Sequence, residues 1–167
     1  MGSEMCIRDR IKQRGLTDEK KKALFNYLAA LGAGNYEQSF QDSLSALVEK
    51  TQQMGGIRSQ VDNFSIPAGK AIGYYTGLNT KNLNIIGSLT LLSSNADVTN
   101  TIHTYVNFLQ SKERAGIERA VGAGNFSKGK FAPKALDKFK KLITIQETYL
   151  KAFDVTATQS QKLQWLH

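Results

Sequence analysis

Residues 101–121 read TIHTYVNFLQSKERAGIERAV and carry the period that decides the fold class. At about 100° per residue, with Ile102 as origin, Leu109 falls near −20° and Val106 near +40°. Ile117 falls at about +60°, on the same face. A half-buried strand would instead alternate apolar and polar residues. The stretch therefore predicts an amphipathic helix whose apolar face packs against other helices.

Four other stretches repeat this spacing, and short segments join them. Only two prolines occur in the 167 residues, and no run alternates as a strand does. Helices joined by short loops favour an all-α bundle of antiparallel neighbours. The expected helices are one that ends at Leu31, before GAGN at 32–35, and others over 36–61, 68–94, 97–121 and 133–153.

Glycine, proline and polar capping residues predict where these helices bend and end. The pair Gly55-Gly56 is expected to kink the second helix. Ser65 and Asp97 are the expected N-caps of the third and fourth helices, and Pro133 suits the first turn of the last one. Residues 122–132, GAGNFSKGKFA, form the expected glycine-rich loop.

Length and composition favour a single globular domain, with 41% hydrophobic and 22% charged residues. No apolar run approaches the ~18 residues of a membrane span, so any membrane anchor is expected outside this sequence. The lone Cys6 has no partner for an internal disulfide. Because MGSEMCIRDR resembles a translated sequencing adaptor, we expect residues 1–10 to be non-native and 11–167 to hold the domain.

The net charge of +8 raises nucleic acid as a partner. The lysines, however, are spread over separate helices, as on solvated faces, at 20–22 and again at Lys134, Lys138 and Lys141. Zinc-ligand spacing, an aromatic RNA platform and a compact helix-turn-helix pattern do not accompany them. We expect no nucleic-acid partner.

The sequence offers little for catalysis. His103 and His167 are the two histidines, and neither has a carboxylate or thiol spaced for acid–base chemistry. The glycine-rich loop lacks the spacing of a phosphate-binding loop and follows a helix rather than a strand. We therefore expect neither an enzyme nor a bound metal or cofactor.

Glu113 falls at about +20° on the helix of residues 101–121, inside its apolar face. An unpaired buried carboxylate costs several kcal/mol. Glu113 should therefore form a structural ion pair with a cation from another helix, Arg58 or Arg14 first, or else face a polar cavity.

The arginines differ in their local partners. Three have an acid four residues later: Arg14 with Asp18, Arg58 with Asp62, and Arg114 with Glu118. Arg119 has none, and its neighbours three and four residues away are Ala115, Gly116, Gly122 and Ala123. Small neighbours leave room beside the guanidinium, whose forked donors suit a small planar anion. The alternative is that Arg119 pairs with an acid on a neighbouring helix.

The segment FLQSKERAGIERAV at 108–121, followed by a loop and a phenylalanine, resembles the NIT domain, the nitrate- and nitrite-sensing module of bacterial receptors. Other segments are similar to successive helices of that family, in the right order. These segments are QRGLTD at 13–18, IRSQVD at 57–62, AIGYYTGLNTKNL at 71–83 and KLITIQETYLKAF at 141–153. The resemblance covers residues 11–153.

This resemblance implies a helical sensor of two bundles, with nitrate or nitrite held by arginines from separate parts of the chain. One family arginine matches Arg119. The other belongs to a Glu-Arg-Gly motif on the first helix of the family. QRG at 13–15 is one candidate copy, but the Thr-Asp at 17–18 favours the second helix of the family pattern. The motif is therefore expected on a helix before residue 11, and the sequence is expected to be partial and to hold half of the site. The candidate anion-binding residues are Arg119, Arg114, Lys112 and Arg58.

Family context further implies a homodimeric sensor on the periplasmic side of a bacterial inner-membrane receptor, first of all a methyl-accepting chemotaxis protein. A histidine kinase, a cyclic-dinucleotide enzyme or a soluble antiterminator could carry the same module. The residues also leave open a ligand-free helical scaffold or dimerisation domain. A carboxylate on both guanidinium nitrogens of Arg119 would favour that alternative.

Overall fold

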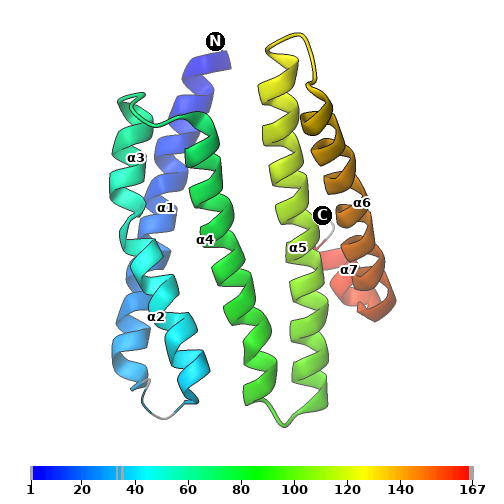
Figure 1. Cartoon of the computed structure of the whole chain (residues 1–167). Coiled ribbons are helices and arrows are strands. Elements are labelled where there is room, and N and C mark those ends of the chain that lie inside the picture. The colour runs from blue at the N-terminus through cyan, green and yellow to red at the C-terminus, as the bar shows by residue number, and fades with distance from the viewer. Residues whose placement is uncertain (1, 33, 35, 166–167) are drawn as a thin grey trace. The chain divides into compact units, whose positions relative to one another are not determined.

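The computed structural model describes residues 2–32, 34 and 36–165, and these contain helices, turns and connections but no strand. The helices are α1 (Gly2–Leu31), α2 (Gln38–Gln52), α3 (Met54–Asp62), α4 (Ala68–Ser88), the 3-10 helix η2 (Leu89–Leu92), α5 (Ala96–Phe126), α6 (Pro133–Thr156) and α7 (Gln159–Trp165) (Figure 1). The predicted all-α fold class is confirmed. Among the described residues, no helix combines the length and apolar character needed to cross a bilayer.

The chain divides into two compact units, residues 1–41 and 42–167. The first unit consists mainly of α1, which ends at Leu31 as expected. The expected stop at 32–35 lies partly outside the described residues, since positions 33 and 35 are not described.

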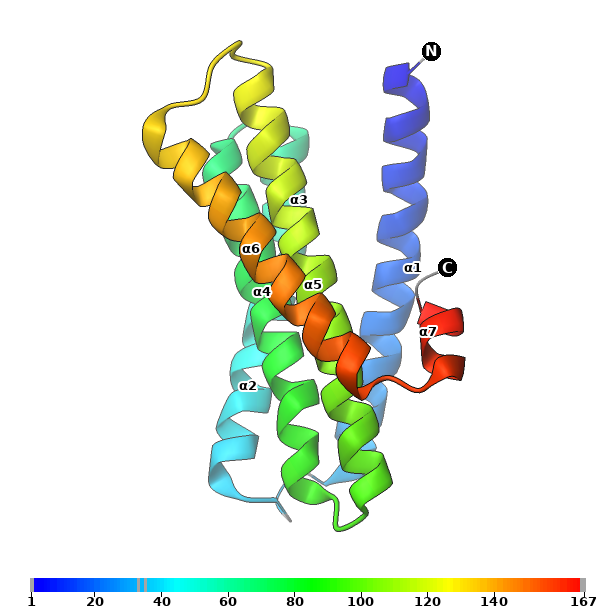
Figure 2. The same ribbon diagram turned by 90° about the vertical axis from the view of Figure 1, so that its right-hand side faces the viewer.

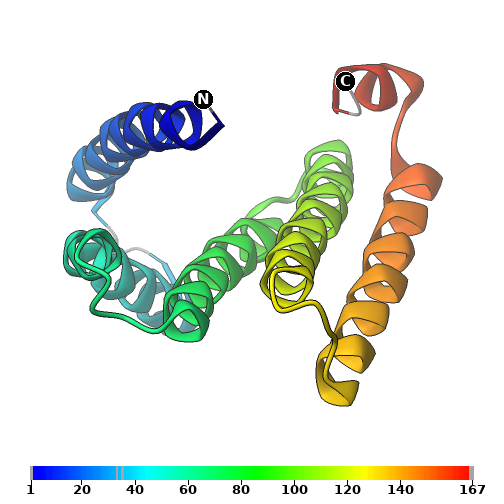
Figure 3. The same ribbon diagram turned by 90° about the horizontal axis from the view of Figure 1, so that it is seen from above.

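In the second unit, α4, α5 and α6 are successive antiparallel neighbours, with α5 in the middle (Figures 1 and 3). Figure 2 shows α6 crossing α5 obliquely. The α5–α6 hairpin has the most extensive contacts of this unit. Because α5 lies between α4 and α6, two of its faces pack against neighbouring helices.

The deepest burial on α5 is on the face opposite the one that the sequence predicts. Ile102, Leu109 and Ile117 are only half-buried. The buried residues are Thr104, Phe108, Ser111 and Gly122, which lie at about 180–240° from Ile102. Phe108 packs against Phe153 of α6, with ring centroids 5.3 Å apart. Small and polar residues fill much of this contact, so it leaves no strong apolar stripe in the sequence.

At Gly122 the lack of a side chain lets α6 approach closely. A Cβ on Gly122 would lie 3.2 Å from Cε2 of Phe139, whereas a Cβ on Gly116 would meet no atom within 4 Å. Alanine is about 0.5–1 kcal/mol better than glycine inside a helix. We expect Gly116→Ala to raise the free energy of unfolding by about this amount and Gly122→Ala to yield no gain. Urea denaturation of both variants tests this. Equal gains in the free energy of unfolding would show that the Phe139 side chain can move away from the added methyl group at little cost.

A second core joins α2 and α3 to α4. It consists of Leu47, Met54, Tyr74 and Leu78. The phenol of Tyr74 donates a hydrogen bond to the carbonyl of Lys50 at 2.6 Å. Burial, aided by Tyr75, raises the pKa of Tyr74, and Arg58 offsets part of that rise. The phenol therefore stays protonated as a donor, and its hydrogen bond ties α4 to the C-terminal part of α2.

Two expected N-caps are corrected by the structure. Asn95, not Asp97, caps α5, because its side-chain oxygen accepts from the backbone N–H groups of Asp97 and Val98 at 2.9 and 3.1 Å. A cap must precede the free N–H groups by two or three residues, and Asp97 lies among them. Ser65 does not cap α4 either. Its hydroxyl donates to the carbonyl of Gln60 at 3.3 Å, and Pro67 occupies the N-cap position.

The expected breaks shift by a few residues. The break in the second helix lies at Gln53, and Gly55-Gly56 lie within the first turn of α3. The glycine-rich loop begins later than predicted, because α5 continues to Phe126 and packing at Gly122 supports it. Pro133 begins α6, which confirms that prediction.

Candidate functional site

The second half of α5 presents two cations on one side of the helix. Lys112 and Arg119 are seven residues apart, which is about two turns, so their side chains leave the helix in nearly the same direction. Both are exposed. The ammonium of Lys112 lies 5.2 Å from the ring centroid of Phe108, which holds the lysine stem against the helix.

Arg119 makes no hydrogen bond or ion pair with any residue that the structure describes. Its five N–H donors therefore face solvent, where an anion can reach them. The space beside it is partly as predicted: Gly116 borders open space, but Phe139 of α6 fills the space at Gly122. The open side of Arg119 is thus the side of Gly116.

Arg114 has different partners from those that the sequence predicts. Its guanidinium donates to the side-chain oxygen of Gln110 at 3.1 Å and lies 5.9 Å from the ring centroid of Tyr149 on α6. Helical side chains lean toward the N-terminus, so Arg114 meets Gln110 one turn earlier rather than Glu118 one turn later. Its donors are partly engaged, and it remains half-buried.

Glu113 has an amide as partner rather than the expected cation. The side-chain N–H of Asn79 on α4 donates to its carboxylate at 2.7 Å. Within the described part of the chain, no Lys or Arg forms an ion pair with Glu113. Because Glu113 is only half-buried, water and one amide can solvate its charge. The second possibility, a polar cavity, is closer to what the structure shows.

Glu113→Gln tests this arrangement. An amide oxygen can still accept from Asn79, so we expect the free energy of unfolding to change by less than about 1 kcal/mol. A buried ion pair would behave differently, since removing one partner costs about 3–5 kcal/mol. A loss of that size in thermal or urea denaturation would show that Glu113 does have a cationic partner.

A groove of about 470 Å³ between α4 and α5 contains this hydrogen bond. Its lining combines apolar and polar side chains: Asn79, Asn82, Leu83, Ile86, Leu109, Lys112 and Glu113. Lys112 brings a positive charge and Glu113 a negative one, so the groove itself is close to neutral. Arg119 lies about two turns after Lys112 on α5, and no carboxylate of the described residues pairs with its positive charge.

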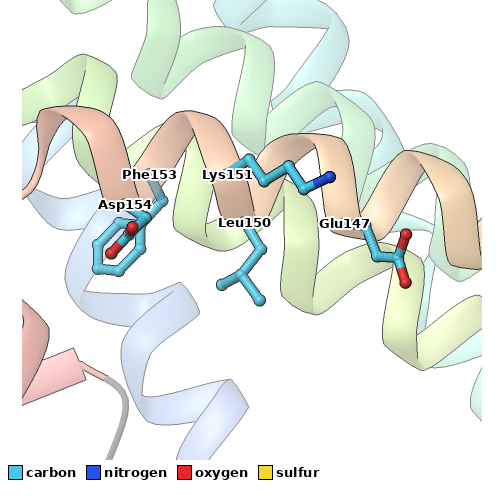
Figure 4. Close-up of a pocket in the computed structure, with 5 residues that line it drawn as sticks. All are labelled: Glu147, Leu150, Lys151, Phe153 and Asp154. Atoms are coloured by element: carbon cyan, nitrogen blue, oxygen red, sulfur yellow. The ribbon is translucent and has the colours of Figure 1, made fainter.

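A second hollow, of about 500 Å³, lies along the C-terminal half of α6 (Figure 4). Glu147, Leu150, Lys151, Phe153 and Asp154 line it. The ammonium of Lys162 on α7 lies 2.6 Å from a carboxylate oxygen of Asp154 and forms an ion pair with it. With two carboxylates in the lining, this hollow is poorly suited to a small anion.

Arg58 is not brought to the other cations. It lies on α3, and Figure 3 shows α4 between α3 and α5. Its positive charge lowers the pKa of Tyr74 and so offsets part of the rise from burial. Of the four predicted residues, α5 itself places Lys112, Arg114 and Arg119, and Arg58 stands apart.

Three polar partners and one helix were not predicted from the sequence. Asn79, Gln110 and Tyr149 take part in the contacts of 113 and 114. The short helix α7 begins with a capping box. The backbone N–H of Gln161 donates to the hydroxyl of Thr158 at 3.2 Å, and the backbone N–H of Thr158 donates to the side-chain oxygen of Gln161 at 2.9 Å. The spacing TQSQ at 158–161 could have predicted it.

The described residues contain no group of three or more His, Cys, Asp or Glu side chains placed to hold a metal. His103 is exposed on α5, and His167 lies outside the described residues.

Comparison with known proteins gives three findings. A family profile described as nitrate and nitrite sensing matches residues 6–167. This match is longer than the resemblance seen in the sequence, which covers residues 11–153, and it begins within the first ten residues. The nitrate regulatory protein of Klebsiella oxytoca is 28% identical over 109 residues, which cover 65% of this chain and 28% of that protein. The chain thus matches less than a third of that relative's length. No solved structure matches the chain.

Proposed function

The chain belongs to the NIT family of nitrate- and nitrite-sensing domains, and on this premise we propose that it binds nitrate or nitrite through Arg119. The observation that carries the proposal is the exposed guanidinium of Arg119, which has no partner among the described residues. Its planar fork matches the planar oxygens of nitrate. No carboxylate of the described residues lies on Arg119, which weighs against the scaffold alternative.

The expected affinity of Arg119 alone is low. Two parallel charge-assisted hydrogen bonds of about 1.5–3 kcal/mol each correspond to a Kd between several millimolar and about 40 μM, before ordering costs. A second cation is needed for tighter binding. We propose the family's second arginine, on a helix preceding residue 11, in that role. Lys112 assists from the same side of α5, and Arg114 and Arg58 contribute less because other groups engage them.

We further propose that the chain is the sensory domain of a larger signalling protein, a homodimeric transmembrane receptor with this domain in the periplasm and with a chemotaxis output as the first candidate. The Klebsiella oxytoca relative is a regulatory protein of which the matched region is 28%. A sensory rather than catalytic role fits the family description.

Titration of the isotopically labelled chain with nitrate and nitrite, followed by amide NMR shifts, tests the binding proposal. We expect saturable shifts in residues 112–123. Chloride and sulfate at matched ionic strength are the controls, because neither offers the flat oxygen arrangement of nitrate. Equal amide shifts on addition of chloride would contradict the proposal and favour the ligand-free scaffold alternative.

A further inference from the structure

The connection between α5 and α6, together with the first turns of α6, carries most of the net charge of the chain. Residues 126–141, here called the basic tip, contain six lysines and one acid, Asp137, so their net charge is +5 of the +8 of the whole chain. The lysines are Lys128, Lys130, Lys134, Lys138, Lys140 and Lys141, and all are exposed. No ammonium among them pairs with a carboxylate of the described residues. The carboxylates of the described residues therefore leave this charge unneutralised.

Apolar side chains are exposed among these lysines. Phe126 is 71% exposed and Leu136 is 38% exposed. The ring of Phe126 packs edge-on against Phe131 at 5.1 Å, and Phe131 packs against Phe139 at 5.6 Å. This row of rings braces Phe126 against the hairpin while leaving most of its surface in water. Apolar side chains that contact one another and are surrounded by charged residues are typical of a contact surface.

The basic tip is at one end of the α5–α6 hairpin (Figures 1 and 2). Such an end projects, so it suits an extended partner surface more than an enclosed small ligand. Lysine stems lie along apolar surfaces while their ammonium groups reach phosphates. Phenylalanine and leucine side chains beside basic residues bury at the boundary between lipid headgroups and acyl chains. We propose that the basic tip docks on an anionic lipid surface, with Phe126 at that boundary.

Nucleic acid fits these observations less well. Single strands are bound in basic grooves lined by several stacking rings, often with arginine. The tip has one strongly exposed ring, and residues 120–167 contain no arginine. The proposal does not depend on nitrate binding, because it uses none of the residues assigned to the anion.

Co-sedimentation of the 167-residue chain with lipid vesicles tests the proposal. We expect binding to vesicles that mix phosphatidylglycerol with phosphatidylcholine, and little binding to phosphatidylcholine alone. High salt should release the protein, because it screens the lysines. Equal binding to neutral vesicles would overturn the proposal.

Two sets of variants locate the surface. Lys128→Gln, Lys130→Gln and Lys134→Gln together should weaken binding on the order of 100-fold, since each lysine near an anionic leaflet contributes about fivefold. Phe126→Ala should weaken it several-fold. The matched control changes three exposed lysines of α1, Lys12, Lys20 and Lys22, to glutamine, and should leave binding unchanged. Circular dichroism confirms that each variant folds.

Two outcomes would contradict the assignment to this tip. Equal weakening in both triple variants would show that overall charge, not the tip, drives binding. If polyuridylate displaces the protein from the vesicles and binds it more tightly through the same lysines, the surface is a nucleic-acid surface.

Discussion

Arg119→Ala is expected to abolish nitrate and nitrite binding and to change the free energy of unfolding by no more than about 0.5 kcal/mol. The two effects separate because Arg119 is exposed and makes no hydrogen bond or ion pair with a described residue. Its removal takes away the forked donor but no packing contact with a partner. A residue that acted only in stability would show the opposite pattern.

Amide NMR titration measures the binding, and urea denaturation measures the stability. Arg119→Lys keeps the charge but loses the two parallel hydrogen bonds, so it should bind several-fold more weakly than the parent. Lys151→Ala, which removes one exposed positive charge from α6, is the matched control and should bind as the parent does. Unchanged nitrate shifts in Arg119→Ala would show that another cation holds the anion.

Phe153→Ala is expected to lower the free energy of unfolding by about 3–5 kcal/mol. Phe153 is 0% exposed, and its ring packs against Phe108 at 5.3 Å, in the main contact between α5 and α6. Alanine would leave a cavity between two long helices, which cannot close without moving one of them. Much of the stability of the second unit therefore depends on this side chain.

Urea denaturation monitored by circular dichroism gives the loss. Phe64→Ala is the matched control, because Phe64 is 95% exposed between α3 and α4 and should change stability by less than about 0.5 kcal/mol. Equal losses in the two variants would mean that the α5–α6 contact is not the core of this unit.

The helices could be predicted from the sequence because helical period and proline position are local properties. Residues 101–121 and the first turn at Pro133 carry their own signals within a few residues. Local sequence does not decide the cap of α5, since Asn95 and Asp97 are both good capping residues and lie two positions apart. No local residue pattern marks the break at Gln53. The nearby pair Gly55-Gly56 is a stronger breaking signal, so the sequence predicts the break there instead.

For the candidate site, the sequence alone determined which cations lie along α5 and that Lys112 and Arg119 share one side, because helical geometry relates residues seven apart. Tertiary structure decided which of them have partners. Glu113 meets Asn79, Arg114 meets Tyr149, and Phe108 meets Phe153. Each pair is more than thirty residues apart in the sequence. No local period encodes such a pair, since it depends on how antiparallel helices align once their apolar faces are buried. For the same reason, only the tertiary structure could show that the most deeply buried face of α5 is the one with small and polar residues, against α6.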